Sequence, residues 1–265
     1  MIPRKIHYCW FGGNPLPDDV KKYIASWKKH CPDCEVIEWN EQNFDISCND
    51  YVKEAYEAKK WAFVTDYVRL YALYHHGGIY IDTDVEAVKS LDELLAYNAV
   101  IGYESETCIS TAVIMACRYS EYIGMLLTDY DNRHFLQKGG SFDMTTNVKT
   151  ITRLTAEKYG LILNGITKKF GENMILLPFE YLCAKSFTTG KLKCTNDTFA
   201  IHHFSGSWLS DTERIRDEFR RHLIPFFGGY VSGKIAGLYY YFLLGGVSGV
   251  FKRIIFKLNK NRCKI

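Results

Sequence analysis

Apolar and polar positions along the first third of the chain follow the pattern of alternating strands and helices. Short apolar runs at 5–11, 35–39 and 79–82 predict three buried strands. Between them, apolar residues recur at helical spacing through about 17–30 and 61–76, which predicts two amphipathic helices. Strands that alternate with helices favour a parallel sheet with right-handed crossovers. We therefore expect an α/β fold with a mainly parallel sheet flanked by helices.

The same alternation continues to about residue 222. Further strands are predicted at 99–103, 112–117, 174–177 and 199–203. Further helices are predicted at 50–58, 91–96, 119–131, 144–159 and 211–223. No internal repeat or low-complexity linker interrupts this part, and 265 residues are enough for one large core. We therefore expect one domain at 1–222.

The segment 223–265 has a different pattern. Its uncharged run at 235–251 is 17 residues long, contains four glycines and is followed at once by basic residues. That length is at the short limit for spanning a bilayer. We predict amphipathic helices that lie on the cytoplasmic membrane surface, with aromatic rings at headgroup depth and Lys or Arg on anionic lipid. A membrane span, or a helix that closes the core or joins an oligomer, is the alternative.

The charge distribution separates the tail from the body. The chain carries a net charge of +3, but from Phe219 onward there are nine basic residues and no acid, so the body at 1–218 carries 3 − 9 = −6. An acidic body argues against nucleic-acid binding. Nine scattered cysteines, of which only Cys31 and Cys34 lie close together, fit reduced thiols in a cytosolic protein better than a zinc or redox site. The first residues show no signal-peptide pattern.

Two carboxylates stand at the end of the third predicted strand. Gly77 and Gly78 end the preceding helix, the strand follows, and Asp82 and Asp84 stand at its end, separated by one threonine. Neighbouring carboxylates repel each other unless a cation lies between them, and oxygen ligands suit Mg²⁺ or Mn²⁺. A calcium loop is discarded because Ala87 stands where that loop requires glycine.

The helix before this strand carries a polar pair. Asp66 and Arg69 lie three residues apart in an otherwise largely apolar or aromatic segment. Burying such a pair is costly unless its groups bind each other or a polar ligand. We therefore expect either a structural ion pair or a ligand contact at this position.

Three motifs give the chain a family resemblance. KIHYCWFGG at 5–13, VTDYVRLYALYHHGGIYIDTDVE at 64–86 and HHFSGSW at 202–208 stand in the order expected for DXD sugar-binding glycosyltransferases. The chain resembles the family 32 enzymes of this group, which include capsular polysaccharide synthesis enzymes and mannosyltransferases. The resemblance implies a GT-A type fold, a nucleotide-sugar donor, Mn²⁺ or Mg²⁺, and retention of anomeric configuration.

The resemblance also implies roles for the acidic residues. Asp84 would bind the metal directly, and Asp82 would contact the ribose and the donor sugar and assist the metal through water. His203 would be the second protein ligand of the metal. Asp66 and Arg69 would hold the sugar hydroxyls.

Further residues would hold the nucleotide. The resemblance implies that Trp10 stacks on the base, that the main chain at Cys9 reads the base edge and that Tyr80 lies near the nucleotide. Ser207 and Trp208 would close over the diphosphate. At 146–148 this chain has Thr-Asn-Val where the family often has a Thr-Gly-Pro turn, so no donor or acceptor role is assigned there.

Several of these residues have a structural alternative. Trp10 is also explained as a core aromatic residue, and Ser207 as a helix cap. One of two adjacent strand residues must face inward, and we expect this to be His202, as a core histidine beside the exposed His203.

The sequence thus predicts a metal-dependent retaining glycosyltransferase on the cytoplasmic side of the membrane. It would move a hexose, with UDP-galactose or UDP-glucose preferred to UDP-N-acetyl sugars and GDP-mannose, to a lipid-linked saccharide acceptor in surface or capsular polysaccharide synthesis. One alternative is a sugar-phosphate nucleotidyltransferase, which would need a basic glycine-rich loop after the first strand. The other is a non-catalytic membrane-associated protein that binds sugar nucleotides.

Overall fold

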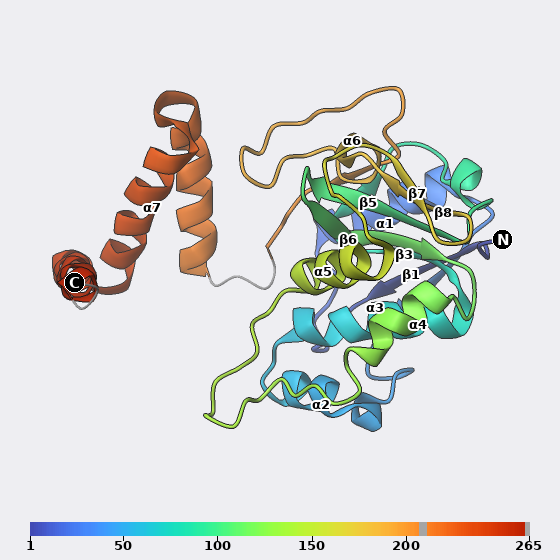
Figure 1. The fold of residues 1–265 in the computed structure, drawn as a ribbon, viewed down its shortest axis with the longest axis horizontal. Coiled ribbons are helices and arrows are strands. Elements are labelled where there is room, and N and C mark those ends of the chain that lie inside the picture. Colours follow the sequence, from blue (N-terminus) through green and yellow to red (C-terminus); the bar gives the residue numbers. More distant parts are fainter. Residues whose placement is uncertain (207–210, 263–265) are drawn as a thin grey trace. The chain divides into compact units, whose positions relative to one another are not determined.

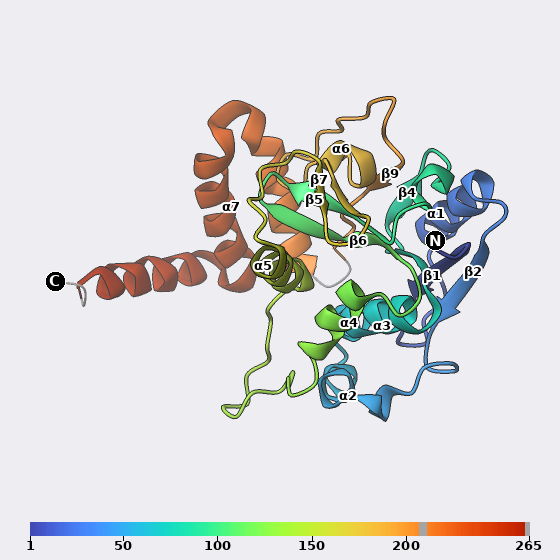
Figure 2. The ribbon, with the colours of Figure 1, turned by 45° about the vertical axis from the view of Figure 1, so that its right-hand side comes forward.

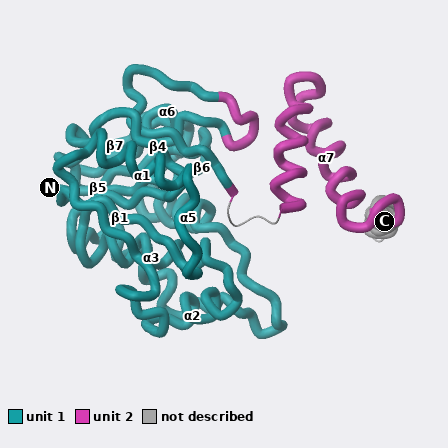
Figure 3. Tube along the Cα trace, turned by 180° about the vertical axis from the view of Figure 1, so that it is seen from behind, with its two compact units in different colours: residues 1–186, 192–205 teal, residues 187–191, 206–265 magenta. Residues whose placement is uncertain are grey.

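The computed structural model describes residues 1–206 and 211–262, which fall into two compact units. The first unit holds 1–186 and 192–205, and the second holds 187–191 and the chain from residue 206 (Figure 3). The domain limits predicted at 222 and 223 stay a prediction.

The first unit is an α/β structure built on a seven-stranded sheet (Figure 1). The strands are β1 (Lys5–Cys9), β2 (Glu35–Trp39), β3 (Gly78–Ile81), β4 (Val85–Ala87), β5 (Ala99–Ser105), β6 (Cys108–Ala116), β7 (Lys168–Phe170), β8 (Met174–Leu177) and β9 (Ala200–His202). The helices are α1 (Asp18–His30), α2 (Asp50–Glu57), α3 (Trp61–His76), α4 (Glu121–Thr128), α5 (Asn147–Tyr159) and α6 (Phe179–Leu182). The helix expected at 91–96 is a single 3₁₀ turn, Asp92–Leu94.

The strand order in the main sheet is β2-β1-β3-β6-β5-β8-β7. The first three strands pair in parallel, as predicted. The other half of the sheet is mixed, because β5 returns directly through a hairpin into β6, and β6 pairs antiparallel with both β3 and β5. The predicted α/β class is confirmed. A separate two-stranded sheet joins β4 to β9.

The sheet is covered on both faces, so its central strands are buried on both sides. Ile79 and Ile81 of β3 belong to the apolar cluster that includes α1, whereas Tyr80 between them belongs to the cluster on the side of α2, α3 and α4 (Figure 2). This alternation follows from the period of two along a strand. The same alternation sets the direction of the next side chain, that of Asp82 directly after β3.

The turn from α3 into β3 is fixed by two glycines and a histidine. Gly77 has φ 63° and its N–H donates to Leu73 O at 2.9 Å, which closes the helix as predicted. The buried His7 accepts from Trp39 Nε1 at Nδ1 (3.1 Å), so its Nε2 donates to Gly77 O (2.8 Å). Burial lowers the pKa of His7 to about 4, so the ring is neutral at pH 7 and this arrangement of donors is maintained.

The second unit is dominated by the helical segment α7 (Asp211–Arg262), so the predicted helical tail is confirmed. Gly228, Gly245 and Gly246 have non-helical backbone angles, which divide α7 into three shorter helices (Figure 1). No helix within 1–206 and 211–262 is long and apolar enough to cross a membrane.

The α3–β3 turn gives a first prediction. Gly78 has φ 118°, and a Cβ placed there would lie 2.6 Å from Lys5 O of the neighbouring strand. Gly78→Ala should therefore lower the free energy of unfolding by at least about 2 kcal/mol, measured by urea denaturation. Gly139→Ala is the matched control, because a Cβ there meets no atom within 4 Å and the backbone is not in the left-handed region. Equal stability of the two variants would contradict this account of the turn.

Candidate active site

The site lies where β1, β2 and β3 end together. Parallel strands bring their carboxyl ends to one edge of a sheet, which is where ligands bind in open α/β sheets. Asp82 and Asp84 leave β3 at this edge and lead into β4. Helix α1 fixes β4 in turn, since Trp27 Nε1 donates to Val85 O at 2.7 Å. The two aspartates are therefore held on both sides by regular structure.

Asp82, Asp84 and His202 form one cluster. Each offers a ligand atom, and these atoms all lie within 4.8 Å of one another. His202 Nε2 lies 3.2 Å from Asp84 Oδ1, and the N–H of Ser205 donates to Asp84 Oδ2 at 2.8 Å. The antiparallel pairing of β4 with β9 sets His202 opposite Val85, directly after Asp84.

The structure places the two histidines differently from the arrangement expected from the sequence. His202, predicted to be a core histidine, is the one that faces the aspartates, with its side chain 12% exposed. His203, predicted as the metal ligand, points elsewhere: its ring stacks on Tyr23 (4.7 Å between centroids) and its Nε2 lies 2.9 Å from Glu86 Oε2. The side chain of His202 does face inward, as expected, but at this position the inward side is the one that holds Asp84.

The environment affects the two carboxyl groups differently. Burial raises the pKa of Asp82, and the nearby charge of Asp84 adds to this rise, although Arg69 opposes it. For Asp84, burial alone would raise the pKa, but the charge and hydrogen bond of His202 and the N–H of Ser205 outweigh it, so the pKa is lowered. The pKa of His202 is raised by Asp84 in spite of burial.

This donor set fits a divalent metal. Two carboxylates and an imidazole suit Mn²⁺ or Mg²⁺, which prefer oxygen ligands and, for Mn²⁺, accept nitrogen. The ring nitrogen of His202 that faces Asp84 is Nε2, at 3.2 Å from Oδ1, so Nε2 is the atom that would bind the ion. Asp82, Asp84 and His202 are the residues that would hold the ion.

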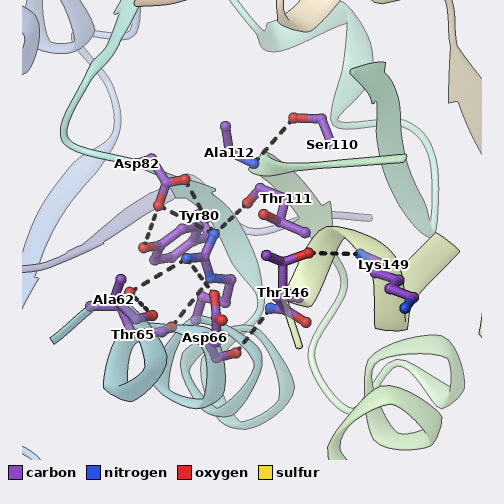
Figure 4. A network of polar contacts seen from close by, with 12 residues as sticks. Ala62, Thr65, Asp66, Tyr80, Asp82, Ser110, Thr111, Ala112, Thr146 and Lys149 are labelled. Carbon is purple, nitrogen blue, oxygen red and sulfur yellow. Dashed lines mark hydrogen bonds and ion pairs between the residues drawn. The ribbon is translucent and has the colours of Figure 1, made fainter. Parts of the chain in front are cut away.

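Arg69 connects the cluster to helix α3; Figure 4 labels its partners Asp66, Asp82 and Thr111. Its guanidinium donates to Thr111 O at 2.7 Å and pairs with Asp66 Oδ1 (3.0 Å) on one side and Asp82 Oδ1 (3.2 Å) on the other. It also lies over the ring of Tyr80, 4.7 Å from the centroid. Burial would lower the pKa of Arg69, but these acidic neighbours raise it, so the cation is retained.

Asp66 and Tyr80 complete this network. Burial raises the pKa of Asp66 to about 6, which the charge of Arg69 opposes. The hydroxyl of Tyr80 donates to Asp82 Oδ1 at 2.9 Å. Asp66 and Arg69 thus form an ion pair with each other, and the same pair reaches the aspartate at the end of β3. The structural and the ligand-binding interpretations of this pair are compatible.

Trp10 lies at an open cleft of about 830 Å³ at the ends of β1 and β2. Trp61 and Tyr56 contribute further aromatic rings to its lining, and the indole N–H of Trp10 donates to Asn14 O at 2.6 Å. Trp10 is half-buried and also packs against the apolar cluster that includes α1, so both interpretations of this residue stay open. The neighbouring Cys9 is buried, and its main chain pairs with Trp39 of β2. The cleft and the acidic cluster share the same sheet edge.

Two predicted residues cannot be placed. Ser207 and Trp208 lie outside the described residues. The part of their motif that is described does reach the cluster, through the N–H of Ser205 on Asp84 and the N–H of His203 on Asp84 O at 2.8 Å.

Sequence reasoning missed the main-chain contributions to the site. Thr111 O, Thr65 O and the N–H of Ser205 all bind charged side chains of the site. Main-chain groups leave no trace in residue identity, so no signal in the sequence could have found them. The position of His202 beside Asp84 would have followed from the sequence if the segment 200–202 had been predicted to pair as a strand with 85–87.

Comparison with known proteins agrees with this location. Residues 17–101, which contain Asp82 and Asp84, match a family model described as a glycosyltransferase sugar-binding region containing a DXD motif. Inositol phosphoceramide mannosyltransferase 3 of Schizosaccharomyces pombe is 32% identical over 121 residues, or 43% of this chain and 33% of the relative. Inositol phosphoceramide mannosyltransferase 2 of the same yeast is 24% identical over 250 residues, or 92% of this chain and 67% of the relative.

A further relative is the mannosyl phosphorylinositol ceramide synthase SUR1 of Saccharomyces cerevisiae, 28% identical over 43% of this chain and 31% of its own length. The matches cover only about a third of mannosyltransferase 3 and of SUR1. Similar solved structures include a glycosyltransferase involved in the glycosylation of the major capsid of PBCV-1 (TM-score 0.41, 10% identity, 82% of this chain and 98% of that chain). Another is the galactosyltransferase LgtC (TM-score 0.40, 12% identity, 88% and 95%). Residues 17–101 of this chain are thus similar to a glycosyltransferase sugar-binding region that contains a DXD motif.

Proposed function

We propose that this chain is a metal-dependent glycosyltransferase that moves a hexose from a nucleotide sugar to a lipid-linked or saccharide acceptor, with retention of configuration. One observation carries the proposal: Asp82, Asp84 and His202 present ligand atoms within 4.8 Å of one another, and the two aspartates lie in the region 17–101 that matches the sugar-binding family. The proposal covers the donor site, and the acceptor is inferred separately from the tail.

The chemistry of the site suits departure of a nucleoside diphosphate. A bound divalent cation neutralises the charge that grows on the diphosphate as the sugar–phosphate bond breaks. Asp66 and Arg69 offer a carboxylate and a guanidinium to sugar hydroxyls, and Trp10 offers a ring face to the base. In the retaining reaction, the acceptor hydroxyl attacks the anomeric carbon on the face the diphosphate leaves, and a phosphate oxygen takes the hydroxyl proton.

The identity of the transferred hexose is the part of the proposal on which the observations place the fewest limits. Relatives of this chain are named for mannose transfer to inositol phosphoceramide, which supports GDP-mannose as a donor. UDP-galactose and UDP-glucose are the donors favoured by the resemblance to polysaccharide-building enzymes. All three are nucleotide hexoses, so a single panel of donors distinguishes them.

The test of this function is a donor panel. The protein should release nucleoside diphosphate from at least one of GDP-mannose, UDP-galactose and UDP-glucose when Mn²⁺ or Mg²⁺ is present, and chelation should abolish the release. Product analysis should show an α-linked sugar from an α-linked donor. Absence of metal-dependent release from every donor, with and without lipid-linked acceptors, would refute the enzyme.

The metal cluster makes a second prediction. Asp84→Asn preserves the shape of the side chain but removes its charge, so turnover should fall at least about a hundredfold, because a metal contributes several kcal/mol to the transition state. Mn²⁺ binding, measured by calorimetry, should weaken in parallel, while the unfolding temperature changes little.

The two histidines provide a matched pair for the same measurement. His202→Gln should weaken Mn²⁺ binding, because His202 lies 3.2 Å from Asp84. His203→Gln should bind Mn²⁺ nearly as the unmodified protein does, because His203 pairs with Glu86. The reverse result would restore His203 as the ligand.

We also propose that α7 attaches the protein to the cytoplasmic face of an anionic membrane, where a lipid-linked acceptor would be found. Phe226, Phe227 and Tyr230 are exposed large apolar residues beside the helix break at Gly228. The chain from Phe219 onward adds nine basic residues and no acid. Exposed aromatic rings combined with positive charge are the features that bind an interfacial helix to anionic lipid.

The membrane proposal predicts the behaviour of an apolar surface variant. Phe226→Ser combined with Phe227→Ser should reduce co-sedimentation with vesicles of phosphatidylserine and phosphatidylcholine, because two exposed rings no longer insert. Ile162→Ser is the control, since Ile162 and Phe226 are both 80% exposed but Ile162 lies in the first unit. If the double variant and the control sediment equally, α7 is not the attachment site.

A further inference from the structure

The chain between α4 and α5 contains a small hairpin that has no part in the proposed reaction. Leu136 and Phe142 form an isolated antiparallel bridge, and Lys138, Gly139 and Gly140 lie in the turn between them. The hairpin comprises residues 134–145. In Figures 1 and 2 the chain between α4 and α5 extends away from the main sheet as a long loop.

The hairpin presents apolar side chains to solvent. Leu136 is 48% exposed, Phe142 42% and Met144 50%. Leu136 and Phe142 are directly opposed in the bridge, and directly opposed residues have their side chains on the same face. Met144 follows two residues after Phe142, the spacing at which residues of an extended chain share a face. Neighbouring exposed apolar groups of this kind mark a surface that contacts something else.

The hairpin is nevertheless held firmly against two helices. Phe135 is fully buried, with ring centroids 5.5 Å from Tyr51 of α2 and 5.0 Å from Phe63 of α3. Glu54 of α2 accepts from the N–H of Leu136 at Oε2 (2.8 Å). The base of the hairpin is therefore part of the core, and its exposed side chains project from a fixed support.

The main chain of the hairpin is suited to an apolar medium. Gln137 N donates to Ser141 O at 2.8 Å, Gly140 N to Gln137 O at 2.8 Å, and Asp143 N to Phe135 O at 2.7 Å. A main-chain N–H that has no partner is costly in lipid, where water does not replace the missing acceptor. A strand that docks to another protein by pairing would instead keep such groups free. The hairpin fits a lipid surface better than a partner strand.

The charge of the hairpin favours an anionic lipid surface. Asp143 Oδ2 is paired with Arg133 at 2.8 Å, and Lys138 adds a positive charge at the turn. The segment 133–145 thus sums to 1 + 1 − 1 = +1 with His134 neutral, in a body that carries −6. A lysine can lay its methylene stem along apolar surface while its ammonium group contacts lipid phosphates.

The hairpin borders the candidate active site. Met144 precedes Asn147 by three residues, so their Cα atoms are at most about 11 Å apart. The buried Asn147 begins α5, and its Nδ2 donates to Asp66 O at 3.3 Å. Asp66 in turn pairs with Arg69 of the site. A lipid surface in contact with the hairpin therefore lies near the residues proposed to hold the donor sugar.

We propose that the hairpin inserts Leu136, Phe142 and Met144 into the surface of an anionic bilayer and so holds the site beside membrane-embedded acceptors. The role of the acceptor rests on the proposed glycosyltransferase function. The hairpin lies in the first unit, so this contact is additional to the one proposed for α7 in the second.

The first test measures vesicle binding by the full chain. Leu136→Ser combined with Met144→Ser should weaken co-sedimentation with vesicles of phosphatidylserine and phosphatidylcholine about tenfold, because two apolar side chains no longer leave water. Phe142 is left in place because its ring stacks on Phe135, 5.1 Å between centroids. Both substituted side chains are about half exposed, so the fold should be retained.

A matched control uses two exposed residues of the first unit outside the hairpin. Ile162 and Ile166 are 80% and 56% exposed. Ile162→Ser combined with Ile166→Ser removes at least as much exposed apolar surface and should bind vesicles like the unmodified protein.

Fluorescence quenching tests insertion directly. Met144→Trp places an indole on the hairpin, and brominated phosphatidylcholine in the vesicles should quench the fluorescence that this residue adds to that of the unmodified protein. Ile166→Trp is the control for this measurement, and its added fluorescence should not be quenched.

Turnover connects the contact to the acceptor. The hairpin double variant should raise KM for a lipid-linked acceptor embedded in vesicles and leave kcat/KM for a water-soluble saccharide acceptor unchanged. If the unmodified protein turns over no donor, the proposed function fails, whereas vesicle binding and quenching still report on the hairpin.

Three results would overturn the inference. The first is equal vesicle binding by the hairpin variant and the isoleucine control. The second is an indole at position 144 that brominated lipid does not quench. The third is a hairpin variant that binds vesicles normally but changes the sedimentation velocity of the protein without vesicles, which would make the hairpin an interface between copies of this chain.

Discussion

The buried guanidinium of Arg69 is the interaction on which the rest of the site depends. It lies between Asp66 on α3 and Asp82 after β3, and it binds Thr111 O on β6. A buried cation with carboxylates on both sides is retained only if its donors are all satisfied, and removing one partner would leave an uncompensated charge. Arg69 therefore ties three elements together at the point where the sheet opens to the site.

The second constraint is the register between β4 and β9. These short strands bring 200–202, more than a hundred residues away in sequence, against 85–87. Because side chains alternate along a strand, a shift by one residue would exchange His202 and His203. The register therefore decides which imidazole meets Asp84, and α1 stabilises it through Trp27 and the main chain of β4.

The sequence was sufficient for features that depend on local pattern. The helix, the glycine turn and the acid-bearing strand at 61–84 were all predictable, because periodicity and glycine chemistry act over a few residues. The direct β5–β6 return, the choice of His202 and the burial of Asn147 were not. The β5–β6 return is a local hairpin, but strands predicted at 99–103 and 112–117 left out its turn between Ser105 and Cys108. The positions of His202 and Asn147 depend on contacts between distant segments, which residue identity alone does not encode. Roles assigned to Ser207 and Trp208 stay predictions.

The charges of the cluster explain why a cation suits it. Asp66, Asp82 and Asp84 contribute −3 when ionised, and Arg69 returns +1. The charge of Asp84 raises the pKa of His202, although burial lowers it. A metal ligand must be a neutral imidazole; with His202 in that form the sum is −3 + 1 = −2, and a divalent ion would bring it to −2 + 2 = 0. The net negative charge of these residues is thus about the charge that a divalent ion would neutralise.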